Sequence, residues 1–164
     1  MHEVLFTPWR SAYITGQTRR EPGCFFCAAA ADGDDPERLV VHRTAHHLVM
    51  LNRHPYNTGH LMIAPLEHLD APEAASPEAV AELWPLAIGV RQVLAEVYRP
   101  DGFNIGMNLG RIAGAGVPDH YHLHVVPRWA GDANFMGAVA NTRLIPEDLD
   151  VGWQKLRERF SKAR

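Results

Sequence analysis

Residues 119–128 read Asp119-His120-Tyr121-His122-Leu123-His124-Val125-Val126-Pro127-Arg128. The three histidines alternate with apolar residues, which is the period of a β-strand and not that of a helix. Side chains two residues apart on a strand leave the same face, roughly 6.6 Å from each other. The pattern therefore predicts a strand with the histidines on one face and apolar residues entering the core from the other: His120, His122 and His124 against Tyr121, Leu123 and Val125.

A row of imidazoles predicts a functional site, because imidazole titrates near neutral pH and can act as a ligand, a proton carrier or a nucleophile. We expect at least one of the three histidines to be catalytic. Two other interpretations are a metal centre, to which a His-x-His pair supplies two ligands, and a polar strand that faces solvent. Three histidines in register beside an apolar face make the solvent-facing strand the weakest of these.

The segment also resembles the signature of the histidine triad nucleotide-binding proteins, His-φ-His-φ-His-φ-φ with φ apolar, at every position. In that family the middle histidine attacks the α-phosphorus of a nucleotide, and a second acceptor cleaves the nucleotidyl-histidine that results. The resemblance implies that His122 is the nucleophile and that His124 contacts a phosphate oxygen or assists the leaving group. It implies a supporting role for His120, the first triad histidine.

Length and composition indicate one ordinary globular domain over residues 1–164, with 46% hydrophobic and 21% charged residues. Within it we expect an N-terminal arm over 1–22 and a C-terminal helical extension over 146–164. The net charge of -3 provides no basic field for a nucleic acid polymer. No apolar run has the length of a membrane span, and the two cysteines lie too close together to staple distant parts of a fold. A cytoplasmic location is therefore expected.

Two common catalytic motifs are missing from the sequence. None of the serines lies in a Gly-x-Ser-x-Gly elbow, so a serine hydrolase is improbable. No glycine-rich stretch precedes a Lys-Ser or Lys-Thr pair, which excludes a P-loop. Histidine remains the abundant reactive side chain.

A Cys-x-x-Cys knuckle lies in Pro22-Gly23-Cys24-Phe25-Phe26-Cys27. Such a pair supplies two thiolates to a tetrahedral zinc ion, whereas a redox pair expects a preceding strand and a following helix. Triad proteins with a similar knuckle complete the site with a histidine after the second hairpin strand and with the first triad histidine. The resemblance thus implies a structural zinc ion held by Cys24, Cys27, His68 and His120, and no catalytic metal.

Residues 47–51 and 60–65 read as two strands joined by a turn, which predicts a hairpin. The turn resembles the Asn-Arg-x-Pro-x-x-x-Gly-His motif of the family's nucleoside site. Asn52 can donate and accept hydrogen bonds, as a ribose diol requires, and His60 would lie at the edge of the same pocket. The alternative is that Asn52 only closes the turn.

Ser76-Pro77-Glu78 predicts the start of the principal helix, with Ser76 as N-cap and Pro77 at the first position. We expect Pro85 to kink or split this helix. Its core face should consist of the apolar residues at helical spacing, which are Val80, Leu83, Trp84, Ala87, Val90, Leu94 and Val97.

The stretch 103–110 alternates, with Phe103, Ile105, Met107 and Leu109 expected in the core. Paired antiparallel with the triad strand, its polar face would lie beside the histidines, and Asn108 is then a candidate phosphate ligand. The glycine-rich loop 111–119 frees backbone N–H groups to face an anion. Relatives carry Gln or Gly and then Ser or Thr at positions 116 and 117 of this loop. The chain has Gly116 and Val117, so the phosphate-binding hydroxyl is missing.

After the triad, Pro127-Arg128-Trp129-Ala130-Gly131-Asp132-Ala133-Asn134-Phe135-Met136 resembles the phosphorylase-like branch of the family. Arg128 offers a charge and Trp129 a stacking surface for a nucleotide, though either could be structural. The early Pro8-Trp9-Arg10 segment resembles the same branch, and Trp9 and Arg10 could help to shape the pocket. Apolar spacing at 149, 153, 156 and 160 predicts a C-terminal amphipathic helix.

The expected fold is α+β and HIT-like, an antiparallel sheet of about five strands with one long helix packed on it and a C-terminal helix. The resemblance implies a homodimer that binds an adenine nucleotide or dinucleoside polyphosphate. It favours a diadenosine tetraphosphate phosphorylase or hydrolase with a nucleotidyl-His122 intermediate. The alternatives are an adenosine phosphoramidase, a nucleotide-binding signalling protein with incidental turnover, and a zinc protein that uses the histidines as ligands.

Overall fold

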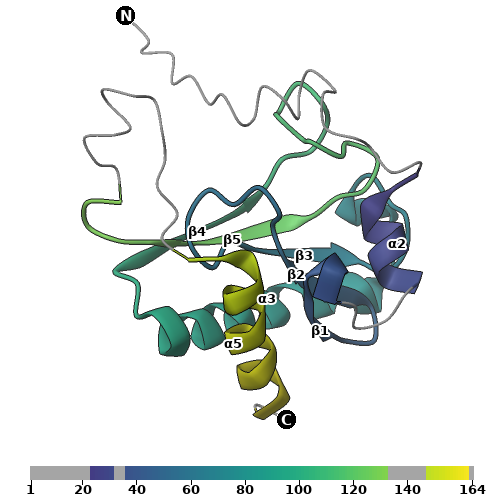
Figure 1. The fold of residues 1–164 in the computed structure, drawn as a ribbon. Helices are drawn as coiled ribbons and strands as arrows, with labels where there is room; N and C mark the ends of the chain where they lie inside the picture. The colour runs from purple at the N-terminus through teal and green to yellow at the C-terminus, as the bar shows by residue number, and fades with distance from the viewer. Residues whose placement is uncertain (1–22, 32–35, 133–146, 163–164) are drawn as a thin grey trace, which may run out of the picture.

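The computed structural model describes residues 23–31, 36–132 and 147–162 (Figure 1). The expectations for the arm over 1–22, with Trp9 and Arg10, lie outside these residues. The segment over 133–146, which includes the end of the stretch that resembles the phosphorylase-like branch, also lies outside them.

Five strands form a single antiparallel sheet in the order β1-β2-β3-β5-β4 (Figure 1). The predicted hairpin is confirmed as β2 and β3, and the predicted α+β architecture is confirmed with it. The strands are β1 Val40–Arg43, β2 His47–Leu51, β3 Leu61–Pro65, β4 Gly102–Met107 and β5 Leu123–Arg128.

The triad segment enters the sheet between β3 and β4, where His124 lies opposite Met62 on one side and Gly106 on the other. The predicted pairing with the 103–110 stretch is therefore confirmed. The strand itself is shorter than predicted, because β5 begins only at Leu123. Before that point the chain bonds to the segment that follows β3: the Tyr121 N–H donates to the Leu69 carbonyl at 2.7 Å.

Helix α3 spans Pro77–Tyr98, and the Ser76 hydroxyl accepts a hydrogen bond from the Ala79 N–H at 3.2 Å, as an N-cap does. Of the two expectations for Pro85, a kink or a split, the split is wrong, since α3 continues through Pro85. Pro85 and Ala81 both lie on the exposed side. There water can solvate the Ala81 carbonyl that the missing Pro85 N–H leaves without a helical donor.

The core face of α3 is narrower than predicted. Leu83, Ala87, Val90 and Leu94 are buried. Val80 and Trp84, also predicted in the core, are 45% and 59% exposed, and Ile88 is 44% exposed. The prediction for Leu109 is likewise wrong: β4 ends at Met107, and Leu109 is 43% exposed.

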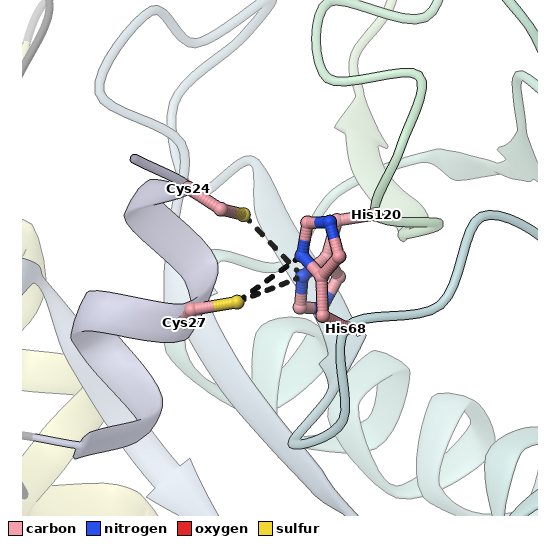
Figure 2. A group of neighbouring side chains, drawn as sticks. All are labelled: Cys24, Cys27, His68 and His120. Atoms are coloured by element: carbon pink, nitrogen blue, oxygen red, sulfur yellow. Dashed lines mark hydrogen bonds between the residues drawn. The ribbon is translucent and has the colours of Figure 1, made fainter. Parts of the chain in front are cut away.

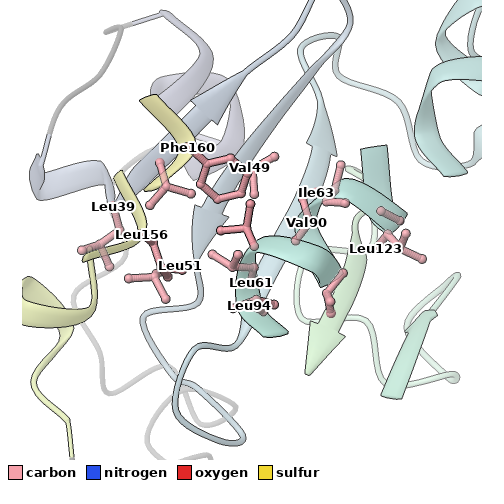
Figure 3. Close-up of a cluster of buried hydrophobic side chains, with 14 of the residues drawn as sticks. Leu39, Val49, Leu51, Leu61, Ile63, Val90, Leu94, Leu123, Leu156 and Phe160 are labelled. Atoms are coloured by element: carbon pink, nitrogen blue, oxygen red, sulfur yellow. The ribbon is translucent and has the colours of Figure 1, made fainter. Parts of the chain in front are cut away.

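A large apolar cluster fills the space between one face of the sheet and the helices α3 and α5 (Figure 3). Helix α5 spans Leu149–Lys162 and buries Leu156 and Phe160, as the sequence predicts. Its Trp153 Nε1–H donates to the Val40 carbonyl at 2.8 Å, and Arg157 donates to the Val41 carbonyl at 3.2 Å. The C-terminal helix therefore also occupies hydrogen-bonding groups of the edge strand β1.

The opposite face of the sheet carries a smaller cluster under helix α2, Phe25–Ala31. Leu48 and Met50 of β2 point to this face, whereas Val49 and Leu51 point to α3. Two short 3-10 helices, η1 Pro36–Arg38 and η2 Pro72–Ala74, complete the described elements. In the part of the chain that the structure describes, no helix is long and apolar enough to cross a membrane.

Candidate functional site

His122 is held in a single tautomer by the backbone beside it. Its Nδ1–H donates to the carbonyl oxygen of His120 at 3.0 Å, which leaves the lone pair on Nε2. Burial lowers the pKa of His122, and the hydrogen bond to the carbonyl opposes that shift only in part. The imidazole is therefore neutral at neutral pH, the form in which it can act as a nucleophile.

His124 takes the opposite tautomer through His60. The backbone N–H of Tyr56 donates to His60 Nδ1 at 3.1 Å, so in the neutral ring the proton of His60 is on Nε2. His60 Nε2 lies 2.9 Å from His124 Nδ1 and donates to it. The proton of a neutral His124 is therefore on Nε2, while that of His122 is on Nδ1. The two triad rings lie edge to face with centroids 4.9 Å apart.

The four predicted metal ligands come together although the knuckle and the triad are far apart in sequence (Figure 2). Their ligand atoms all lie within 4.8 Å of one another. His120 Nδ1 is 3.4 Å from Cys24 Sγ and 3.7 Å from Cys27 Sγ, and His68 Nδ1 is 3.2 Å from Cys27 Sγ. Two thiols and two imidazoles are a donor set that tetrahedral zinc prefers.

The protonation of His120 fits a metal ligand. Its Nε2–H donates to the Pro65 carbonyl at 3.0 Å, so the lone pair of Nδ1 faces the thiols. Burial lowers the pKa of His120 to about 4, against the opposing effect of that hydrogen bond. Burial, followed by the adjacent Cys24 thiol, raises the pKa of Cys27, and a bound cation would favour the thiolate there. The residues fit a zinc ion.

The hairpin turn brings Asn52 next to the histidines. Asn52 Nδ2 lies 3.4 Å from His60 Nδ1, and its Oδ1 accepts a hydrogen bond from the His54 N–H at 2.9 Å. The side chain therefore helps to close the turn. His60 is fully buried, so it lies behind His124 and does not form an open pocket edge.

Asn108 and the loop after it lie beyond the end of β4. Asn108 is half-buried, and its Nδ2 would lie 4.0 Å from a Cβ built on Gly114, so its side chain faces the loop. Gly116 is exposed. Val117 is half-buried and packs against the α2 cluster, which gives an apolar residue at this position a packing role.

Arg128 is engaged within the chain. Its Nη2 donates to Asp132 Oδ1 at 2.9 Å, its Nε donates to the other carboxylate oxygen, and its Nη1 donates to Asn104 Oδ1 at 2.7 Å. The guanidinium holds the pKa of Asp132 well below its usual range. The backbone N–H of Trp129, which is half-buried, lies 3.3 Å from the same carboxylate. In this arrangement Arg128 stabilises the end of the triad strand.

Three contributors were not singled out from the sequence. Asn57 is buried and donates to the Pro127 carbonyl at 2.9 Å and to Asp132 at 2.7 Å, which joins the hairpin turn to the end of β5. Tyr56 contributes its N–H and a ring 5.8 Å from His124. Phe26 packs on His120 and His122. Asn57 and Tyr56 occupy unspecified positions of the turn motif, so composition alone does not mark them.

The three alternating histidines lie in β5 of a five-stranded antiparallel sheet and directly before it, as in a histidine triad protein, and the first of them, His120, also belongs to the Cys2His2 cluster. The chain belongs to the HIT family, because the sequence model of the HIT domain matches residues 35–131. The predicted family is thereby confirmed.

Among its relatives, the AP-4-A phosphorylase of Mycobacterium tuberculosis (strain ATCC 25618 / H37Rv) is 38% identical over 149 residues, which cover 87% of this chain and 76% of that protein. An uncharacterized HIT-like protein of Methanocaldococcus jannaschii is 34% identical over 126 residues, 74% of this chain and 92% of the relative. The fold resembles the crystal structure of a zinc-bound histidine triad family protein from Mycobacterium smegmatis. That structure gives a TM-score of 0.68 at 28% identity, over 86% of this chain and 95% of the other.

Proposed function

We propose that the protein is a nucleotidyl-transferring enzyme that cleaves dinucleoside polyphosphates, as a diadenosine tetraphosphate phosphorylase or hydrolase. The observation that carries the proposal is the pair of opposite tautomers, with a lone pair on His122 Nε2 and a proton on His124 Nε2. The 38% sequence identity to the AP-4-A phosphorylase of M. tuberculosis supports dinucleoside polyphosphates as the substrate class.

In the first step, the lone pair of His122 Nε2 attacks the α-phosphorus of one adenylyl group. A bond forms between Nε2 and phosphorus, and the bond from phosphorus to the bridging oxygen breaks. His124 donates a hydrogen bond from its Nε2–H to that oxygen and keeps its proton, and ATP leaves from diadenosine tetraphosphate as an anion. His122 keeps its Nδ1 proton and becomes a cationic phosphoramidate, which the His120 carbonyl stabilises and which breaks down more readily than a polyphosphate.

In the second step, an oxygen of inorganic phosphate or of water attacks the same phosphorus. The nitrogen–phosphorus bond breaks, His122 recovers its Nε2 lone pair, and the proton that the acceptor loses passes to solvent. Phosphate gives ADP and water gives AMP. Both phosphate and water remain candidate acceptors, because Val117 is an apolar packing residue at the position where relatives carry a hydroxyl.

The remaining residues would hold the nucleotide and the strand. Asn52 would face the ribose, Asn108 and the backbone N–H groups of the loop through Gly116 would face the phosphates, and Trp129 would stack on a base. Zinc would be held by Cys24, Cys27, His68 and His120 and would supply a structural cross-link, with no contact to the reacting phosphorus.

We further propose that the enzyme is a homodimer. Trp84 and Ile88 are exposed on one side of α3, and Arg91, one turn further on, lies 5.4 Å from the Phe103 ring of β4. The apolar side of α3 therefore borders β4, which ends the order of the described sheet. A second copy would cover this surface and this edge together. Light scattering should give twice the chain mass, and Trp84→Glu should give the monomer.

The function is tested by incubating the protein with diadenosine tetraphosphate, with and without inorganic phosphate, and identifying the products by chromatography. ADP plus ATP only with phosphate would define a phosphorylase, and AMP plus ATP without it a hydrolase. If neither pair appears while an adenosine phosphoramidate is cleaved, the protein belongs with the phosphoramidases and the proposal is wrong.

A further inference from the structure

Phe26 lies at the junction of the metal ligands and the nucleophile. It is flanked by Cys24 and Cys27, and its side chain is fully buried. The ring centroid lies 5.0 Å from that of His120 and 4.9 Å from that of His122, with interplanar angles of 39° and 38°. A single aromatic side chain thus contacts both a ligand and the residue proposed to attack phosphorus.

A second connection joins the same groups through the backbone. The carbonyl of His120 accepts the Nδ1–H of His122, while the His120 ring points its own Nδ1 at the two thiols. A displacement of residue His120 as a whole relative to α2 therefore acts on the carbonyl and on the Phe26 ring at once. The His120 carbonyl meets the Nδ1 edge of the His122 ring, and the Phe26 ring lies against the His122 ring at a tilt of 38°.

We propose that Phe26 is a positioning residue that transmits zinc binding to His122, so that closure of the Cys2His2 site holds the nucleophile in its attacking orientation. This inference rests on the proposed function, because it assigns His122 as the nucleophile. It adds a role for the metal site: the cross-link orders the α2 face of the sheet at the reacting group. The rest of the fold is held independently by α3 and α5 on the other face.

A purely structural Phe26 would fill the α2 cluster and nothing else. The two roles differ in coupling. If Phe26 only fills space, its substitution and the removal of zinc act independently, and their effects on turnover multiply. If Phe26 transmits zinc binding, removal of zinc should lower turnover only slightly in a variant that already lacks the aromatic ring.

The test compares wild type, Phe26→Leu and Phe25→Leu, each loaded with zinc and after chelation. Phe25 is a matched control because it lies in the same turn of α2. Its ring is tilted against that of Phe26, with centroids 4.1 Å apart, and it has no ring contact with a described histidine. For each form we would measure zinc content, the unfolding midpoint, kcat and KM for diadenosine tetraphosphate, and the 15N signals of the His122 ring. Assays are run below the lowest unfolding midpoint.

We expect chelation to lower kcat of the wild type about tenfold or more, with a smaller change in KM, since groups behind a ligand commonly carry effects of this size. Phe26→Leu should lose a similar factor with zinc bound and less than about threefold more on chelation. Phe25→Leu should behave as wild type. The His122 signals should move from one tautomer toward a mixture on chelation of the wild type, and Phe26→Leu should show the mixture already with zinc.

Equal loss of kcat on chelation in wild type and Phe26→Leu would overturn the inference, as would a wild type that binds no zinc or that keeps its full kcat without it. Failure of the proposed function is a separate result. If the wild type cleaves no dinucleoside polyphosphate, the His122 signals still decide whether Phe26 couples the two groups.

Discussion

The two faces of the sheet are built from alternate residues of the same strands, yet they differ in what they bury. The face under α3 and α5 buries mainly apolar side chains, which include Val49, Ile63 and Leu123. The face under α2 buries His120 and His122 with Phe26 against them. Neighbouring residues of the triad segment therefore differ in role, one packing in the core and the next lying at the reactive site, because successive side chains of an extended chain point in opposite directions.

His47 shows that the type of residue does not decide the role. It is fully buried, but its Nδ1 lies 2.9 Å from the carboxylate of Glu82 on α3, to which the Thr44 hydroxyl also donates. His122 has a neutral backbone carbonyl as its partner instead. A histidine bound to a helix carboxylate joins two elements, whereas one held by a carbonyl keeps a free lone pair. The following predictions test this division between the faces.

The largest effect should come from His122→Ala. Removal of the nucleophile should lower kcat by about 10³-fold or more and leave the unfolding midpoint close to wild type. Initial rates and thermal unfolding measure the two quantities. Label from the α-phosphate of diadenosine tetraphosphate should stay on wild-type protein after quenching in alkaline denaturant, in which a phosphoramidate survives, and be absent from the variant. A variant that keeps a tenth of the wild-type rate would show that His122 is not the nucleophile.

Leu123→Ala should lower stability and leave kcat unchanged, although Leu123 lies between the two reactive histidines in the sequence. Truncation of this side chain, which is 3% exposed, should cost about 2–5 kcal/mol of unfolding free energy. The value of kcat should stay near wild type while the protein is folded. Urea unfolding and kinetics at low temperature would check this. A large loss of kcat in folded variant would show that the two faces are not separable.

Glu82→Ala tests the exception on the α3 face. It leaves the buried His47 Nδ1 and the Thr44 hydroxyl without this partner, which should cost about 1–3 kcal/mol with no change in kcat. Glu78→Ala, at an exposed position in the first turn of the same helix, is the control. Reduced turnover in folded Glu82→Ala would mean that His47 contributes to the chemistry after all.

The smallest effect concerns pH. Because burial lowers the pKa of His122 below 6.5, the unprotonated form still predominates at pH 6.5. The value of kcat/KM should therefore keep more than about half of its neutral value there, and fall only at lower pH as the ring takes up a proton. Rates measured from about pH 5 to pH 8 check the sign. An acid limb centred above pH 6.5 would contradict the burial of His122.

Much of the fold was readable from local patterns. The hairpin, the N-cap Ser76 and the C-terminal helix were predicted because each depends on residues close in sequence. Val80 and Trp84 were misplaced because helical spacing identifies apolar residues without showing how wide the covered face is. A continuous helix through Pro85 could not be told from a split one, because the effect of the missing N–H depends on whether the freed carbonyl meets water.

By itself, the sequence determined which chemical groups are available: three alternating histidines, a pair of cysteines and a turn that precedes His60. Only the tertiary structure decided which ring nitrogen of each histidine carries the proton. The deciding partners are the carbonyls of His120 and Pro65 and the N–H of Tyr56. Every residue type except proline carries both backbone groups, so no side-chain pattern marks the ones that face a ring. Their choice follows from packing that brings Cys24 to His120 across 96 positions.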